Sequence, residues 1–284
     1  MIRRSFATLA CLTMLALGAS RAAAQQRPLV TEDPETVGSG VALLEVGMDY
    51  LIEEEFPASG LTGDLLRLPL YGLSFGVSSI AEIQIDGGLR SSLSITEQVT
   101  APLSSMLTVT GDSTRSVDDL VIGTKVRLRA ESDGGPALGF RFATKLPNAG
   151  NESGLGLDTT DFFASFLLGK TIRSVRVVGN FGLGILGDPT RGDRQNDVVT
   201  YGVSVARAVA EGFEVVGELN GRVHTREGAP PPGTESRSLM RAGARFTRGA
   251  GRIDAALIVG VTTIGPGIGV TAGYTHAFNA MTIP

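Results

Sequence analysis

The feature that most constrains this chain is a two-residue alternation of apolar and polar side chains, which recurs from about residue 40 almost to the end. In one such stretch Leu120, Ile122 and Val126 share one parity, whereas Lys125 and Arg127 share the other. Successive side chains of a β-strand point to opposite faces, so a period of two predicts strands. Because no helical period stands out after residue 25, the sequence predicts an all-β protein.

The alternation divides the chain into about twelve strand-like segments. Most are about 10 to 14 residues long, which matches or exceeds the 9–11 residues that a tilted strand needs to cross the hydrocarbon of a membrane. Strands of globular proteins average only about 5–6 residues. The segments span residues 40–52, 64–76, 81–93, 117–130, 136–147, 158–169, 172–186, 196–209, 212–225, 237–248, 251–262 and 267–279.

The links between these segments alternate in length. Short links lie around residues 77–79, 132–135, 170–171, 210–211 and 249–250, and longer polar links occupy residues 94–116, 148–157, 187–196 and 225–236. Such an alternation predicts up-and-down antiparallel strands with the long loops on one side, which is the layout of outer-membrane barrels. Whether the 94–116 loop folds into the pore stays open.

The two faces of the strands decide between a barrel in lipid and one in water. A soluble periplasmic β-protein gives the same alternation with its apolar face inward, so it remains an alternative. Strand length, the many glycines on the charged parity and the aromatic residues in "GVTAGYTHAF" (269–278) favour the membrane. We therefore predict an antiparallel up-and-down transmembrane β-barrel of about 12 strands over residues 40–279.

The N-terminus has the order of a secretory signal peptide. Arg3 and Arg4 precede an apolar run, and small residues end at Ala24, which predicts residues 1–24 as the signal and residues 25–39 as a periplasmic segment. A lipoprotein signal at Cys11 and a twin-arginine signal are weaker readings of the same stretch. Residues 280–284 form a short C-terminal tail. Cleavage would remove the only cysteine and three arginines, and the resulting acidic chain argues against a nucleic-acid partner.

One motif imitates a nucleotide site. "GLGILG" holds Gly182, Gly184 and Gly187 in the G-x-G-x-x-G spacing of a dinucleotide-binding loop. That loop must open a helix and be followed by a carboxylate about 20 residues later, but here Pro189 and a further strand-like segment follow. We therefore interpret the motif as part of a glycine-rich strand, with Gly182 and Gly184 facing the lumen, and we expect no cofactor.

Other candidates for chemistry are sparse. His224 and His276 fall on different segments without the spacing of metal ligands. "GDSTRSVDD" (111–119) and "GNESGLGLDTTD" (150–161) are acidic and glycine-rich, but they lack the acidic spacing of a dedicated calcium loop. We therefore expect no catalytic, cofactor-binding or metal-ligating residues.

The charged side chains on the inward parity are the most informative group. Acidic segments neighbour basic ones, so opposite charges are placed to pair across the wall. They either form ion-paired ladders that fill a narrow lumen or line a permeation path with a transverse field. As pore-lining candidates we name Glu45, Asp49, Glu82, Asp86, Lys125, Arg127, Arg129, Arg141, Lys145, Glu214, Glu218, Arg222, Arg241 and Arg245.

Several stretches resemble a bacterial family of outer-membrane transporter-like proteins labelled "MetA-pathway of phenol degradation". They are "RPLVTEDPETVGSGVALLEVG", "DDLVIGTKVRL" and "FATKLPNAGNESGLGLDTTDF", with Thr31-Glu32-Asp33, Lys125, Lys145-Leu146-Pro147 and Asp161 carrying most of the likeness. The resemblance implies an outer-membrane barrel that passes small, often hydrophobic molecules. The chain departs from the usual outer-membrane ending, a terminal aromatic residue, because "NAMTIP" follows Phe278.

Taken together, the sequence predicts a passive outer-membrane channel for small solutes, hydrophobic or aromatic by resemblance. Its expected partners are outer-membrane lipid, the barrel-assembly machinery and the solute. The alternatives are a plugged structural or adhesive barrel without transport and, behind it, an outer-membrane lipid hydrolase. The sequence indicates neither the solute nor the oligomeric state.

Overall fold

The computed structural model describes residues 27–132 and 134–281, so the predicted signal peptide and the last three residues of the tail lie outside the described residues. The described chain holds fourteen strands and two single-turn 3₁₀ helices. The strands are β1 (Val41–Phe56), β2 (Leu61–Gly76), β3 (Ala81–Gly88), β4 (Ser91–Gln98), β5 (Ser113–Ser116), β6 (Leu120–Arg129), β7 (Ala137–Leu146), β8 (Asp161–Ile172), β9 (Val175–Gly187), β10 (Gln195–Ala210), β11 (Phe213–His224), β12 (Arg237–Arg248), β13 (Gly251–Gly260) and β14 (Ile268–Asn279). The helices are η1 (Ser104–Met106) and η2 (Asn151–Ser153).

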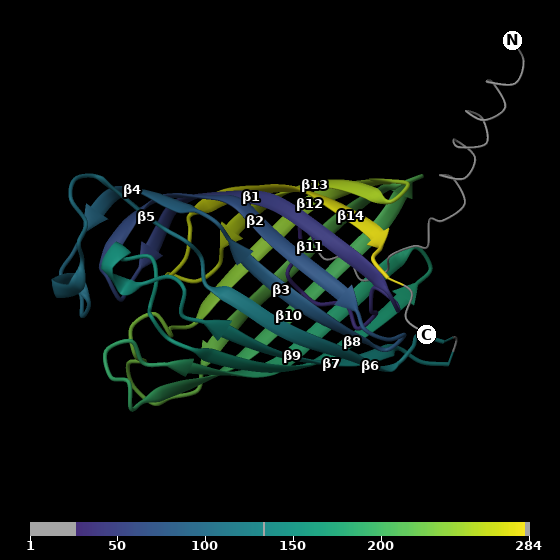
Figure 1. Cartoon of the computed structure of the whole chain (residues 1–284), viewed down its shortest axis with the longest axis horizontal. Coiled ribbons are helices and arrows are strands. Elements are labelled where there is room, and N and C mark those ends of the chain that lie inside the picture. The colour runs from purple at the N-terminus through teal and green to yellow at the C-terminus, as the bar shows by residue number, and fades with distance from the viewer. Residues whose placement is uncertain (1–26, 133, 282–284) are drawn as a thin grey trace, which may run out of the picture.

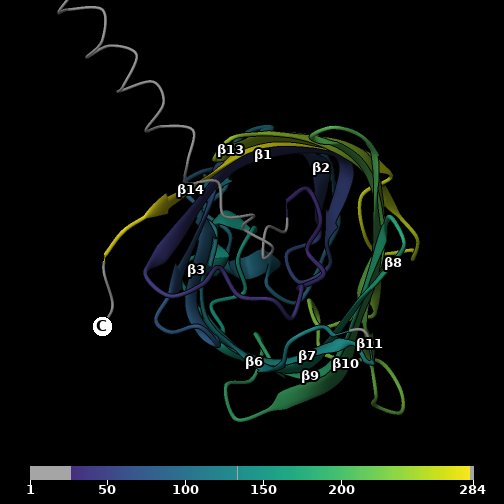
Figure 2. The ribbon, with the colours of Figure 1, turned by 90° about the vertical axis from the view of Figure 1, so that its right-hand side faces the viewer.

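Twelve of these strands close into an antiparallel barrel, which confirms the predicted fold class. Sequence neighbours pair around the ring from β6 to β14, and β3 bridges β6 and β2. Strand β1 closes the ring because it pairs with β14 on one side and with β2 on the other. Figures 1 and 2 show the tilted strands from the side and along the barrel axis.

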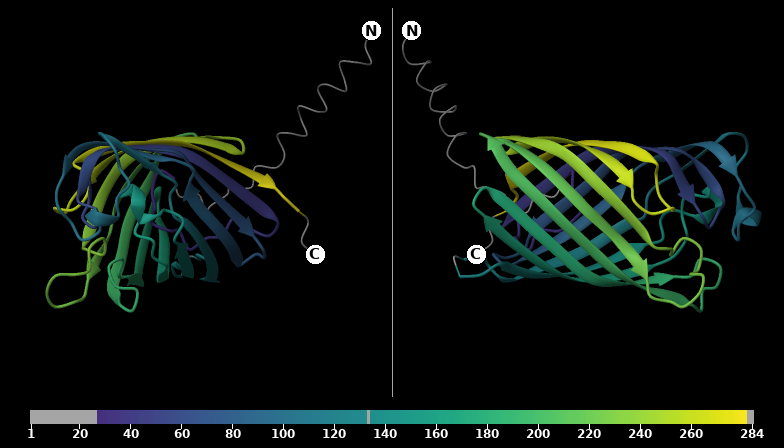
Figure 3. Two further views of the ribbon diagram at one scale, coloured as in Figure 1. Left: turned by 60° about the vertical axis from the view of Figure 1, so that its left-hand side comes forward. Right: turned by 180° about the vertical axis from the view of Figure 1, so that it is seen from behind.

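The two ends of the barrel differ. Five tight turns of two to seven residues connect β2 to β3, β6 to β7, β8 to β9, β10 to β11 and β12 to β13 at one end, which we call the turn end. The links at the other end, the loop end, include residues 147–160, 188–194, 225–236 and 261–267. All the long excursions gather at that end (Figure 3), so the predicted alternation of short and long links is reproduced in space.

One predicted strand is broken in two. The segment expected over residues 81–93 consists of β3 and β4, because the chain bends at Leu89 and Arg90 beside a bulge in β2. Strands β4 and β5 then extend the sheet beyond the barrel rim, joined by a loop that contains η1 (Figure 1). Both ends of the 94–116 link are therefore an extension of the wall, and Leu107 and Val109 in its middle pack against the apolar residues of the barrel interior.

Side-chain exposure follows the predicted parity. Outward positions carry large exposed apolar residues such as Phe166 and Phe181, which are 64% and 61% exposed. Inward positions are buried and hold most of the charge, and the apolar exterior is what a barrel in lipid requires. The interior of the barrel, rather than a layer between sheets, is thus the core of the molecule. No helix among the described residues is long and apolar enough to cross a membrane.

Candidate functional site

The segment that precedes the first strand runs through the interior of the barrel. Figure 2 shows the purple chain before β1 inside the ring of strands. Leu29, Thr31, Glu32 and Val37 in this segment are buried. We expected residues 25–39 to form a periplasmic segment; in the structure, residues 27–39, which we call the lumen segment, lie within the turn-end half of the lumen.

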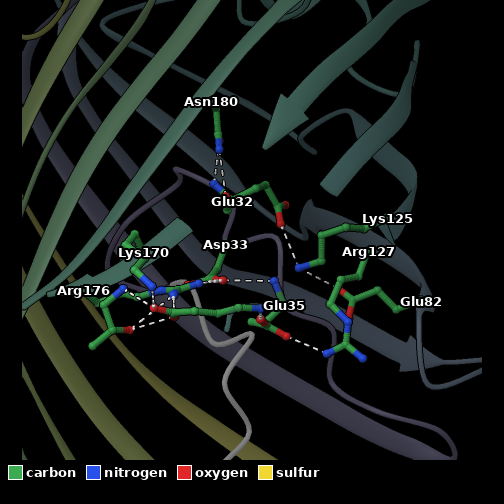
Figure 4. A network of polar contacts seen from close by, with 11 residues as sticks. Glu32, Asp33, Glu35, Glu82, Lys125, Arg127, Lys170, Arg176 and Asn180 are labelled. Atoms are coloured by element: carbon green, nitrogen blue, oxygen red, sulfur yellow. Dashed lines mark hydrogen bonds and ion pairs between the residues drawn. The ribbon is translucent and has the colours of Figure 1, made fainter. Parts of the chain in front are cut away.

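Acidic side chains of the lumen segment pair with basic side chains of the wall (Figure 4). Glu32 lies 3.3 Å from Nζ of Lys125 and 3.1 Å from Nε of Arg141. Glu35 lies 2.6 Å from Nη1 of Arg127. Lys125 is fully buried, and its second partner is the wall residue Glu82 at 3.0 Å. Because buried charges need partners, these contacts explain why the segment is inside.

Asp33 makes the most directional of these contacts. Nε and Nη2 of Arg176 donate to its two carboxylate oxygens at 2.9 and 2.7 Å, a bidentate geometry. Nη1 of Arg176 also donates to Glu131 in the β6–β7 turn at 2.5 Å. The guanidinium thus joins the lumen segment to a turn of the barrel.

The wall also recognises the backbone of the lumen segment. The amides of Val30 and Thr31 donate to Glu218 at 2.8 and 2.6 Å, and the amide of Val37 donates to Glu82 at 2.7 Å. The side-chain amide of Asn180 accepts from the Glu32 amide at 2.7 Å and donates to the Glu32 carbonyl at 2.8 Å. Backbone groups that are buried without partners are costly, so this set holds the segment in one position.

Most of the pore-lining candidates face the lumen and form ion pairs. The expected cross-strand pairs are present at Glu82–Lys125, at Glu214–Arg245 (2.7 Å) and at Glu218–Arg241 (2.9 Å). The remaining paired candidates are Glu45 with Arg252, Asp86 with Arg141, Lys145 with Asp119 and Asp161, and Arg127 and Arg141 with the lumen segment. Arg222 instead donates to the carbonyls of Gly233 and Glu235 in a loop.

Two candidates behave differently. Arg129 is exposed and faces away from the lumen row, because a bulge places it opposite Leu138, an outward position. The structure therefore places Arg129 outside the row of lumen-facing side chains, although we expected it to line the pore. Asp49 does face the lumen, but it has no hydrogen bond or ion pair with any other residue in the described ranges.

Several lumen charges were not among our candidates. Arg27 lies 3.6 Å from Asp254, and Glu54 lies 2.6 Å from Arg237. The acidic run of the lumen segment was noticed only as part of a family resemblance. A surplus of basic residues on the inward parity of β6 to β9 is the signal that would have indicated an acidic partner for the wall.

The loop-end half of the lumen is filled by apolar side chains. Leu51, Leu61, Leu65, Leu93 and Ile258 form what we call the apolar cluster. Partly buried residues of two loops, among them Leu107 and Leu155, pack against it. Water is thus displaced from most of this half by apolar contact, with the buried Glu54–Arg237 ion pair as an exception, whereas the turn-end half is closed mainly by ion pairs.

A cavity of about 620 Å³ lies between these closures. Its lining combines the lumen segment, the inward faces of β1, β2, β3 and β7, and the 147–160 loop. Its lining includes Arg27, Asp49, Arg67, Leu70, Asp86 and Leu155. Its volume falls within the roughly 300–1,000 Å³ of small-molecule sites.

The G-x-G-x-x-G stretch and the two histidines lie in the strands of the barrel wall. Gly182 and Gly184 lie buried in β9, where a Cβ on Gly182 would come within 2.4 Å of the Ala164 carbonyl oxygen. This confirms the interpretation of that stretch as a glycine-rich strand. His224 ends β11 at the loop end, whereas His276 lies near the turn end of β14. In the described part of the chain, no three or more His, Cys, Asp or Glu residues gather as a metal site would require.

No family model and no curated protein matches the chain. Among solved structures it is similar to the COG4313 outer membrane channel from Pseudomonas putida F1, with 14% identity, 87% of this chain and 98% of that chain covered, and a TM-score of 0.61. It is also similar to the translocator domain of the autotransporter NalP from Neisseria meningitidis, with 12% identity, 97% and 98% covered, and a TM-score of 0.50. The chain therefore has an outer-membrane β-barrel fold.

Proposed function

We propose that this protein is a passive channel of the bacterial outer membrane for small solutes, closed at rest by its own lumen segment. The observation that carries the proposal is the cavity, which is large enough for a small molecule and bounded by a segment that no strand pairing holds. The similarity to a protein described as an outer membrane channel supports it. Hydrophobic or aromatic solutes are the class implied by the resemblance to the phenol-degradation family.

In this mechanism a solute enters between the loops and rests in the cavity. It passes to the periplasm when the lumen segment moves. The segment is held by ion pairs and hydrogen bonds, and their groups can be hydrated one after another as it leaves. Passage then follows the concentration gradient, with no cofactor required.

The alternative is a plugged barrel with a structural or adhesive role. The lumen segment forms hydrogen bonds and ion pairs with five wall residues: Glu218, Asn180, Arg176, Lys125 and Glu82. These contacts favour the alternative, because a plug that never moves would be held in the same way. Catalysis is a weaker candidate. The two histidines lie near opposite ends of the barrel, and we propose that the protein is not an enzyme.

A reversible disulfide between the lumen segment and the wall distinguishes the channel from the plugged barrel. An ideal Cβ on Gly202 would lie 3.4 Å from the Cβ of Thr31, close to the separation in disulfides. The variant Thr31→Cys/Gly202→Cys should therefore tie the segment to β10 when oxidised. In planar bilayers we expect wild-type current, loss of that current on oxidation and its return on reduction.

Two controls complete the design. Thr31→Cys alone should conduct regardless of redox state. Neutralising the segment in Glu32→Gln/Asp33→Asn/Glu35→Gln should raise the open fraction, since four wall cations lose a partner. Absence of current in the wild type and in this triple variant would favour the plugged barrel. Membrane fractionation with a heat-dependent gel shift tests the outer-membrane location.

A further inference from the structure

The charged residues that line the cavity fall into two groups. Most are engaged in ion pairs or hydrogen bonds with the lumen segment or the wall: Arg27, Glu32, Glu45, Asp86, Asp118, Asp119, Arg141, Lys145 and Arg241. Arg67 and Asp49 are not: neither forms a hydrogen bond or an ion pair with any residue of 27–132 or 134–281. The exception is confined to one face of the cavity, made by β1 and β2.

These two residues are direct neighbours. Asp49 and Arg67 are cross-strand partners, and both line the cavity. Their Cβ atoms are therefore about 4.5–5.5 Å apart, as in any such pair. Yet no nitrogen of Arg67 comes within 4.0 Å of a carboxylate oxygen of Asp49. Nε of Arg67 is also shielded from water and has no hydrogen-bond partner.

The surroundings are apolar on the loop-end side. Leu65 and Leu51, two residues from Arg67 and Asp49 along their strands, belong to the apolar cluster. Leu70 and Leu155 complete the nearby apolar lining. A cation and an anion that have no partner among the described residues thus lie side by side, at the border between the apolar and the ion-paired halves of the lumen.

We propose that this face of the cavity binds a small zwitterion with an apolar side group, of the α-amino-acid type. Its carboxylate would accept hydrogen bonds from the Arg67 guanidinium, and its ammonium group would donate to Asp49. The apolar group would lie against Leu70 and Leu155. This inference rests on the proposed function, because it names the class of solute that occupies the channel's cavity.

The pairing of signs excludes simpler ligands. A plain carboxylate would gain Arg67 but lie next to the Asp49 carboxylate, and a plain amine would face the reverse conflict. An uncharged molecule would leave both charges without a partner. Only a ligand with both signs at short separation satisfies both groups, and charge-assisted hydrogen bonds are the strong ones.

The absence of tryptophan from the chain provides a clean probe. Binding of L-tryptophan to the refolded protein is measured by its fluorescence anisotropy, against indole-3-propionate, tryptamine and indole, with empty micelles subtracted. These probes share the indole ring; indole-3-propionate lacks the ammonium group, tryptamine lacks the carboxylate, and indole lacks the whole side chain. We expect L-tryptophan to bind more tightly than each of the other three by about tenfold or more.

Two variants assign the contacts. Arg67→Gln should weaken tryptophan binding about tenfold to a hundredfold and abolish the preference over tryptamine. Asp49→Asn should abolish the preference over indole-3-propionate. Arg191→Gln, in an exposed loop where the arginine pairs only with Asp193, should change neither. The heat-dependent gel shift verifies that each variant has folded.

The outcomes distinguish this inference from the channel itself. Equal affinity for the four probes, or tryptophan affinity unchanged in both folded variants, would overturn the zwitterion site even if the protein conducts. Selective tryptophan binding without any current would support the site and overturn the proposed channel. Saturating tryptophan should also reduce single-channel current in the wild type and not in Arg67→Gln.

Discussion

The two halves of the lumen are closed by opposite means. At the turn end, the lumen segment is fixed by ion pairs such as Asp33–Arg176 and by hydrogen bonds from its backbone to the wall. At the loop end, Leu61 and Leu65 of the apolar cluster exclude water mainly by contact, and the buried Glu54–Arg237 ion pair is the charged exception in this half. Both fillings produce a buried interior, so burial by itself does not distinguish a movable closure from a fixed one.

The difference lies in what each closure does when it is disturbed. An apolar contact that is lost leaves a cavity and nothing else. An ion pair that loses one member leaves a buried charge, which must be hydrated or find a new partner. The contacts of the turn-end half therefore require particular partners, and water can replace those partners. The contacts of the loop-end half accept any apolar neighbour, but water cannot replace them. This is the arrangement expected if the lumen segment, rather than the apolar cluster, is the moving part.

The largest expected effect is at Lys125. Lys125→Met leaves Glu32 and Glu82 in the lumen without their shared cation, and we expect the free energy of unfolding to fall by about 3–5 kcal/mol. Urea unfolding in detergent micelles measures the change. Arg191→Gln, an exposed pair, is the matched control and should cost less than 1 kcal/mol by the general rule for surface pairs. A loss at Lys125 no larger than at Arg191 would remove the contrast between the two halves.

The next effect is at the loop end. Leu61 is fully buried in the apolar cluster, so Leu61→Ala should cost about 3 kcal/mol through lost contact and a residual cavity. Its cost should not change between about 0.1 and 1 M salt, over which the Debye length falls from about 10 to 3 Å. Unfolding at both salt concentrations tests this. A salt-dependent cost at Leu61 would contradict an apolar closure.

Much of the barrel could be predicted because parity is a local property. Phe181 points outward and Gly182 inward simply because they are adjacent in a strand, and ring closure follows once every strand has an apolar face. Bulges are harder to predict. The bulge beside Leu128 turns Arg129 out of the lumen row, and no feature of that stretch distinguishes it from Lys125 or Arg127 before the pairing with β7 is known.

The lumen segment could not be predicted for a different reason. Residues 27–39 have no periodicity, and their partners come from β3, β6, β9 and β11, which are brought together only by closure of the ring. The cross-strand pair Glu218–Arg241 was expected from neighbouring strands of opposite charge. That Glu218 also holds the amides of Val30 and Thr31 depends on the three-dimensional path of the segment.

A smaller effect should follow from Asp33→Asn. Arg176 loses its bidentate partner but keeps Glu131, so its charge is still paired. We therefore expect the free energy that holds the lumen segment in place to fall by only about 1–2 kcal/mol. Hydrogen exchange of the Glu32 and Val37 amides should become about tenfold faster, because it reports opening of the segment. Exchange in β12 should stay unchanged, because its charged side chains pair with β1 and β11 and not with the lumen segment. Equal acceleration in both places would mean that the whole barrel, and not the segment, has loosened.

The smallest effect is a pH dependence at the two ends. Burial raises the pKa of Glu131, but hydrogen bonds from Thr171 and Lys170 and the charge of Arg176 outweigh it, so the pKa of Glu131 is lowered overall. At the loop end, burial likewise raises the pKa of Asp188, and hydrogen bonds from the Thr190 side chain and backbone reverse the shift, so it too is lowered. A lowered carboxylate pKa stabilises the folded state above the group's unfolded pKa, and that contribution is lost as pH falls through the folded value.

The stability difference between wild type and Glu131→Gln should therefore shrink on acidification, and that between wild type and Asp188→Asn should shrink in the same direction. Only Glu131 touches the network of the lumen segment, through Arg176. Acid should thus accelerate hydrogen exchange at Glu32 in the wild type and in Asp188→Asn, while Glu131→Gln should show fast exchange already at neutral pH. If Asp188→Asn also exchanged fast at neutral pH, the two ends would be coupled, and the separation between an ionic and an apolar closure would fail.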